Sequence, residues 1–215
     1  DAARPAGPCY AAEIMPTFAP ILENAFVRLE PFEERHREPL RAAADDPALW
    51  RFHALNQHNA TFDRYFDHYL AETAAGRECA FAILDRATGA IAGSSCYLAV
   101  SPPNKRLEIG STWYAAPFQG GAVNPAAKRL LIGHALDTLG WNRVEFKLDA
   151  RNARSWAAMR KLGALEEGIH RAHMILPDGH IRDSVWFSIL PADWPRVRAG
   201  LDARLAAAQA RPPTP

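Results

Sequence analysis

The chain has 215 residues, 48% of them hydrophobic and 23% charged, which is enough apolar material for one globular domain with a buried core. Its 25 Lys and Arg residues nearly balance 24 Asp and Glu residues, so the net charge of +1 provides no basic field for nucleic acid. No apolar run approaches the ~20 residues that a bilayer span needs. We therefore expect neither nucleic-acid nor membrane partners.

The two ends of the chain lack the periodicity of packed elements. Residues 1–14 are small and polar, without the cationic start and apolar centre of a signal peptide, and Met15 offers an alternative start. Three cysteines, an odd number in a chain of this size, favour reduced thiols and a cytoplasmic protein. We expect an N-terminal extension over 1–14, one domain over 15–205, and a frayed tail over the Ala- and Pro-rich residues 206–215.

Hydrophobic periodicity predicts the elements of the first half of the chain. Residues Phe26–Glu30 alternate in polarity before Pro31, which indicates a strand. A helix is expected over Glu33–Ala44, and another over Thr61–Ala75 with Thr61 as its N-cap. The segment between these helices, Trp50–Asn59, is rich in His and Asn and is expected to be irregular.

The second half of the chain alternates strands with helices. A Thr-Gly pair and a Pro-Asp-Gly triplet predict the turns of two hairpins. The whole order, β-α-α-β-β-β-α-β-α-β-β-α, predicts a single mixed α/β domain. The expected strands are Cys79–Asp85, Ala90–Val100, Leu107–Tyr114, Val144–Leu148, Leu165–Leu176 and Ile181–Leu190, and the expected helices are Pro125–Leu139, Ala153–Leu162 and one from about Pro195.

A small-residue loop, Gln119–Pro125, lies between a predicted strand and a predicted helix. Gly120 and Gly121 allow the backbone to turn tightly and to approach a ligand closely. Asn124 suits the N-cap and Pro125 the first helical position, so we expect the helix to begin there. Exposed N–H groups at a helix N-terminus bind anions such as a pyrophosphate. The alternative is that these residues only turn the chain.

This loop resembles the pyrophosphate loop of the GNAT superfamily of acyl-CoA N-acyltransferases, which reads Gln/Arg-x-x-Gly-x-Gly/Ala before a helix. Gln119 stands at its first position and Ala122 at its first glycine, while Asn124 replaces the usual Gly or Ala. Backbone N–H groups remain donors whatever the side chain, so the loop still suits phosphate.

Further motifs extend the resemblance over roughly residues 20–195. Leu107–Tyr114 is similar to the fourth strand of the family, and Asp149–Ser155 with Lys161–Ala164 to its second cofactor element. Arg182–Ser188 resembles the closing strand of the ribosomal-protein N-terminal acetyltransferase branch, the RimJ/RimL type. The resemblance implies a mostly antiparallel mixed sheet with helices on both faces, in which the fourth and fifth strands are parallel and splay apart around acetyl-CoA.

The resemblance also implies roles for single residues. Glu108 stands where several GNAT enzymes carry the general base, and we expect it on one strand face with Gly110, Thr112 and Tyr114. Ser155 is the candidate for protonating the leaving thiolate, because Met159 stands where many members have a tyrosine. The expected contacts of acetyl-CoA are Trp113, Gln119, Gly120, Gly121, Ala122, Val123, Asn124, Asn152 and Ser155.

Each role has a purely structural alternative. Glu108 could be an ion-paired strand carboxylate, and Asn152 with Ser155 could simply cap a helix. Tyr114 is more suited to packing than to chemistry. The histidine pairs His53/His58 and His170/His173 lack a third ligand at a zinc spacing, so we expect no metal.

The expected function is transfer of acetyl from acetyl-CoA to a primary amine, such as the α-amino group of a protein or peptide, or a small molecule. The resemblance implies that the acceptor enters over Trp50–Asn59 and the hairpin at residues 165–190. Arg171 or a histidine of this hairpin could orient a carboxylate of the acceptor. The resemblance also allows a homodimer. Two alternatives remain: a transferase using another acyl-CoA, and a CoA-binding sensor with little catalysis.

Overall fold

The computed structural model describes residues 20–54 and 61–210, so the predictions for residues 1–14, for His58 and for the end of the tail lie outside the described residues. One eight-stranded sheet has the order β1-β2-β3-β4-β5-β6-β8-β7. Only β5 and β6 pair in parallel among its described strands. The strands are β1 (Leu22–Glu23), β2 (Val27–Pro31), β3 (Cys79–Asp85), β4 (Ile91–Ser101), β5 (Arg106–Tyr114), β6 (Arg143–Asp149), β7 (Leu165–Ile175) and β8 (Ile181–Ile189).

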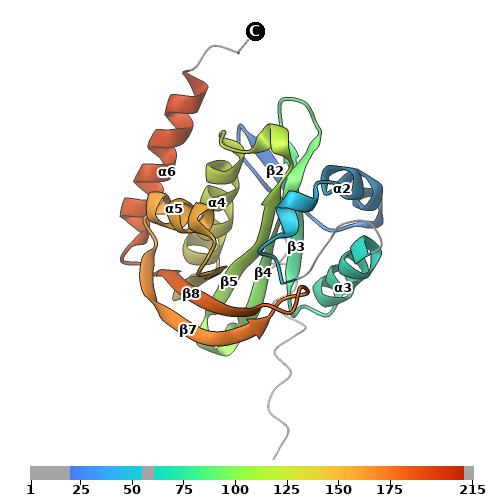
Figure 1. Ribbon diagram of the computed structural model, residues 1–215. Coiled ribbons are helices and arrows are strands. Elements are labelled where there is room, and N and C mark those ends of the chain that lie inside the picture. The colour runs from blue at the N-terminus through green and yellow to red at the C-terminus, as the bar shows by residue number, and fades with distance from the viewer. Residues whose placement is uncertain (1–19, 55–60, 211–215) are drawn as a thin grey trace, which may run out of the picture.

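Helices cover both faces of the sheet, as expected (Figure 1). Alternating strand residues give each face its own apolar cluster, since successive side chains point to opposite sides. One cluster joins the sheet to α4 and α6, and the other joins it to α2 and α3. The helices are α2 (Arg37–Ala43), α3 (Phe62–Ala74), α4 (Val123–Gly133), α5 (Ala153–Leu162) and α6 (Trp194–Gln209). In the described part of the chain, none is both long and apolar enough to cross a membrane.

Three helical predictions need correction. The expected helix over Glu33–Ala44 is divided into a 3₁₀ turn, Glu34–His36, and α2. Residue Asn124 is not an N-cap, because α4 begins at Val123 with Ala122 as its cap. The helix expected over Pro125–Leu139 is α-helical only as far as Gly133, and a π-helical segment, His134–Thr138, follows it. Periodicity detects the apolar face of a helix but not its hydrogen-bond spacing, and cap preferences of single residues do not fix where a helix begins.

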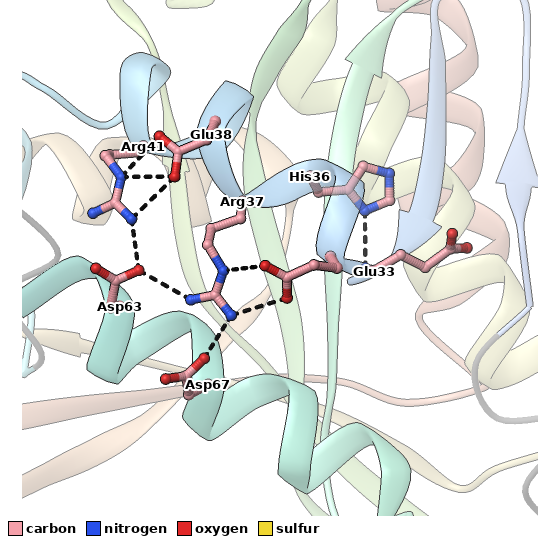
Figure 2. Close-up of polar contacts among 8 residues, drawn as sticks. Glu33, His36, Arg37, Glu38, Arg41, Asp63 and Asp67 are labelled. Carbon is pink, nitrogen blue, oxygen red and sulfur yellow. Dashed lines mark hydrogen bonds and ion pairs between the residues drawn. The ribbon is translucent and has the colours of Figure 1, made fainter.

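An ion-pair network joins α2 to α3 (Figure 2). The Arg37 guanidinium lies 2.5 Å from Glu34, 3.0 Å from Asp63 and 2.6 Å from Asp67. It also lies 4.4 Å from the ring centroid of Phe66, which is fully buried. The guanidinium therefore covers the edge of the aromatic cluster beneath α3 while linking the two helices.

The parallel pairing of β5 with β6 is short. It extends from Arg106 and Arg143 to Glu108 and Glu145, and beyond these residues neither strand pairs with the other. The strands therefore separate towards the end of β5, which confirms the splayed parallel pair.

A β-bulge near Ser111 changes which residues of β5 face α4. The register with β4 shifts between Gly110 and Trp113, and Ser111 has a φ of 46°, which is uncommon for a residue with a Cβ. Thr112 consequently contacts α4, whereas Trp113 joins the cluster of α2 and α3. The expectation that Thr112 and Tyr114 share a face with Glu108, opposite Trp113, is therefore wrong, because strict alternation does not continue through a bulge.

We expect Arg37→Met to lower the free energy of unfolding by about 1 kcal/mol, since the pairs are partly exposed and the apolar stem is kept. In a protein of this size this is a fall of about 2–4 °C in Tm. Arg171→Met is the control, because Arg171 is exposed and has no ion pair among the described residues. Equal Tm values for both variants would show that the network contributes nothing to stability.

Candidate active site

The loop between β5 and α4 is held by hydrogen bonds of the Gln119 side chain. Gln119 donates from Nε2 to the Tyr114 carbonyl oxygen at 2.7 Å, and its Oε1 accepts from Arg154 at 2.9 Å. Gly120 follows with a φ of 77°, a conformation that favours glycine. Arg154 therefore brings a positive charge from α5 to the loop, as a phosphate site requires.

The N-terminus of α4 has no side-chain cap. Ala122 cannot provide one, and the Asn124 amide oxygen accepts from the Tyr114 hydroxyl at 3.2 Å. Added at Gly121, a Cβ would meet no heavy atom within 4 Å, so space lies beside the loop. Uncapped helix N–H groups, small residues and Arg154 together fit a pyrophosphate. The buried side chain of Val123 limits its contribution to its backbone N–H.

Residues Asn152 and Ser155 lie at the start of α5, the helix that follows β6. The Asn152 side chain accepts from the Ser155 backbone N–H at 3.0 Å, which confirms the predicted N-cap. This bond uses the backbone of Ser155 and leaves its hydroxyl outside the cap. The contact of both residues with the cofactor, and the acid role of Ser155, stay predictions.

A buried carboxylate lies where the parallel pairing ends. Glu108 is 3% exposed, and its carboxylate accepts from Lys147 Nζ on β6 at 3.1 Å. Burial raises the pKa of Glu108, and the positive charge of Lys147 opposes that effect. Tyr114, by contrast, lies on the α4 face and its pKa is raised by burial, so it stays neutral. Glu108 is thus the stronger candidate for accepting a proton.

Residues of β7 and β8 extend the face that carries Glu108. Lys147 Nζ lies 5.2 Å from the ring centroid of Trp186, which pairs with it across β6 and β8. Arg182, 5% exposed, acts electrostatically on Glu108. His173 Nδ1 lies 3.0 Å from Ser184 Oγ, and burial with nearby cations lowers the pKa of His173.

Within residues 20–54 and 61–210, three buried N–H donors of this face have no hydrogen-bond partner: Trp113 Nε1, Arg182 Nε and Trp186 Nε1. Buried donors are normally paired, so unpaired ones need an explanation. Trp113 also packs on Trp50, at 5.4 Å between ring centroids. Its indole therefore lies away from α4, and its contact with acetyl-CoA stays a prediction.

His170 and His173 form no metal centre with other described side chains, and His58 of the other pair lies outside the described residues. No group of three or more His, Cys, Asp or Glu side chains suited to a metal occurs among the residues described. His170 and His173 lie 5.6 Å apart between ring centroids and contact Trp186 instead. Burial, with a smaller contribution from the charge of Arg182, lowers the pKa of His53 to about 4.

Comparison with known proteins decides the family. Residues 27–165 match the family described as the acetyltransferase (GNAT) domain, which is well over half of the chain. The chain belongs to this family. Its members are acyl-CoA N-acyltransferases, so the assignment made from the loop and its flanks is confirmed, with acetyl-CoA as co-substrate.

Individual relatives agree with the GNAT assignment. The Bacillus subtilis (strain 168) protein YdaF, named as a ribosomal N-acetyltransferase, is 36% identical over 91 residues, which are 42% of this chain and 49% of that protein. The match thus spans about half the length of this relative. A GCN5-related N-acetyltransferase from Brucella melitensis has a TM-score of 0.80 at 29% identity, over 87% of this chain and 86% of that one. Mycobacterium smegmatis RimJ, in complex with CoA-disulfide, shares the fold with a TM-score of 0.76 at 21% identity, over 90% and 97%.

Sequence reasoning assigned no role to Lys147, Arg154 or Arg182. Alternation of β6 already places Lys147 on the face opposite Val144 and Phe146, so its side of the sheet was predictable. Its pairing with Glu108 was not, since that depends on the register between two strands distant in sequence. The hairpin residue expected to orient an acceptor was Arg171, which is exposed, whereas Arg182 is the buried arginine of this hairpin.

If the loop binds pyrophosphate, Gly121→Glu should abolish stabilisation by acetyl-CoA without unfolding the protein, because the site has room for a side chain but not for a second negative charge. Saturation at ~100 times Kd should stabilise the wild type by about 2.7 kcal/mol. This corresponds to a rise of about 5–10 °C in Tm, measured by thermal unfolding.

The matched control is Gly121→Gln, which adds nearly the same volume without charge. It should keep most of the ligand-induced rise in Tm. A full rise in Gly121→Glu would contradict the assignment of the loop to phosphate.

Proposed function

We propose that this chain transfers acetyl from acetyl-CoA to an α-amino group, with Glu108 as general base. The observation that carries the proposal is the position of Glu108, buried at the end of the parallel pairing and on the face opposite α4. The phosphate loop begins α4, so the cofactor and the base would meet at the gap between β5 and β6. An amine entering from the Glu108 face would reach the thioester there.

The ionisation of Glu108 suits a modest base. Burial raises its pKa, which strengthens it as a base, while Lys147 at 3.1 Å keeps a charged form available. Glu108 would take a proton from the attacking ammonium, directly or through water. Lys147 would then hold the carboxylate in position rather than react.

The pKa of the acceptor decides how much help it needs. An α-amino group of pKa ~7.8 is roughly one part in seven neutral at pH 7, whereas a lysine of pKa ~10.4 is about one part in several thousand. The difference in the free energy of deprotonation is ~3.5 kcal/mol. An α-amino group is therefore the easier substrate for this site.

The three buried N–H donors without partners also support an α-amino group as the acceptor. Trp113 Nε1, Arg182 Nε and Trp186 Nε1 can only donate, and each lies on the face that carries Glu108. A peptide N-terminus or an amino acid places carbonyl or carboxylate oxygens next to its amine, which such donors would bind. Polyamines have no such oxygens. His170 and Trp186 also line a pocket of about 220 Å³ beside β7, which would take the rest of the acceptor.

A turnover screen tests the function. The wild type is assayed for CoA release with N-terminal peptides, aminoacyl compounds, polyamines and aminoglycosides, and with several acyl-CoAs. We expect release with the first two classes. Tight acetyl-CoA binding without turnover on any amine would instead identify a CoA-binding sensor, and a preference for a longer acyl group would identify a different transferase.

Glu108→Gln should lower kcat/KM by about 10²–10⁴ at neutral pH, because the amide keeps the shape but cannot accept the proton. The loss should shrink as pH rises towards the pKa of the amine, since the amine then arrives neutral. The Kd of acetyl-CoA, measured by calorimetry, should stay within about a factor of three.

Glu145→Gln is the matched control. Glu145 is a buried carboxylate in register with Glu108, but Arg143 and Arg106 bind it, at 2.6 and 3.4 Å. Its variant should lose stability and keep its kcat. A Glu108→Gln variant with wild-type rates across the pH range would reduce Glu108 to a structural carboxylate, and a loss of the same size at every pH would indicate an orienting role.

A further inference from the structure

A second buried titratable group lies at the gap, on the opposite face from Glu108. Lys128 belongs to α4 and is 5% exposed. Its Nζ donates to Thr112 Oγ1 on β5 at 3.0 Å and lies 5.5 Å from the ring centroid of Phe146 on β6. The ammonium thus contacts both strands beyond their last parallel pair, Glu108 with Glu145.

The charge of this ammonium is poorly balanced. The described residues offer it one hydrogen-bond acceptor, Thr112 Oγ1, and no carboxylate. Two residues of β4, Ser95 and Cys96, lie near the ammonium. The Ser95 hydroxyl lies 2.7 Å from Thr112 Oγ1. Burial raises the pKa of Cys96, so its thiol stays neutral and provides no negative charge. Burial accordingly lowers the pKa of Lys128 to about 7.

Packing alone does not account for a lysine here. An apolar side chain of similar length would fill the same space without the free-energy cost of burying an unpaired cation. Costly buried charges of shifted pKa concentrate at functional sites. The loop proposed to bind pyrophosphate begins the same helix, so Lys128 lies on the cofactor side of the sheet.

We propose that Lys128 protonates the leaving thiolate of CoA, an inference that rests on the acetyl transfer proposed above. The amine lone pair forms the new C–N bond, and the electron pair of the C–S bond leaves on sulfur. Sulfur then takes a proton from Lys128 Nζ, while the proton of the amine goes to Glu108. Both groups return to their starting states by exchange with solvent.

The two pKa values favour proton transfer from Lys128 to the thiolate. A thiol of pKa ~8.5 is a weaker acid than an ammonium of pKa near 7, so proton transfer to the thiolate is downhill. Met159 stands where many relatives carry a tyrosine, which leaves Ser155 as the other candidate for this role, and a serine hydroxyl is a far weaker acid than this ammonium. Base and acid would lie on opposite faces of β5, so neither could neutralise the other directly.

The test compares two variants, Lys128→Met and Lys128→Arg, with a control, Lys105→Met. Lys105 is an exposed lysine in the segment after β4. We expect kcat of Lys128→Met to fall about 10²–10⁴-fold, with the Kd of acetyl-CoA within about threefold. Its Tm should rise, because the unpaired cation is gone. Lys128→Arg keeps a permanent charge that cannot be given up, so it should be as slow as Lys128→Met.

The pH dependence separates proton donation from packing. The kcat of the wild type at saturating amine should fall as pH rises above about 7, the pKa of Lys128, and this fall should vanish in Lys128→Met. Between about 7 and 10.5 the unfolded chain binds the extra proton, so stability should rise with pH in the wild type and less so in Lys128→Met.

Several results would overturn the role of Lys128. These are turnover of Lys128→Met within threefold of the wild type, wild-type rates in Lys128→Arg, and a Tm of Lys128→Met that falls or cannot be measured. An absent alkaline limb in the wild-type profile would do so without any variant. A wild type that releases no CoA with any amine refutes the acetyl transfer itself, and the role of Lys128 falls with it.

Discussion

The separation of β5 from β6 is the constraint on which the site depends. Pairing stops at Glu108 and Glu145, and β5 then carries Ser111 at a φ of 46°, a conformation that costs of order 1–3 kcal/mol outside glycine. The bulge re-aims the end of the strand, so Thr112 faces α4 and Trp113 the opposite side. Beyond Glu108 and Glu145 the facing edges of β5 and β6 no longer pair with each other, as binding of acetyl-CoA between them would require.

Contacts from α3 support the strained segment. The Tyr69 hydroxyl lies 2.9 Å from Ser111 Oγ, and Tyr65 approaches Ser94 on the neighbouring strand at 3.4 Å. Both tyrosines are buried in the cluster that Arg37 and Arg41 border, with Arg41 4.6 Å from the ring centroid of Phe62. The ion pairs between α2 and α3 therefore border the packing that holds β5 in its bulged form.

The two faces of the sheet divide the proposed chemistry. On the α4 face lie the phosphate loop, Arg154 near Gln119, and the buried ammonium of Lys128. On the other face lie Glu108, its partner Lys147, and donors that suit the oxygens of a peptide. Proton uptake from the amine and proton delivery to sulfur would thus occur on opposite sides of one strand, with the reacting carbonyl between them.

The sequence by itself determined the family, the order of most elements, the caps at Asn152 and Thr61, and the loop at Gln119–Val123, because these depend on local periodicity and turn chemistry. The sequence also indicated Glu108 as the candidate base, because it stands at the position of the general base in several GNAT enzymes. Only the tertiary structure decided that Lys147 binds Glu108, that Trp113 and Thr112 exchange faces, and that Lys128 and Arg182 are buried. Each of these depends on strand register or on contacts between distant segments, and a one-residue bulge reverses the face of every residue after it.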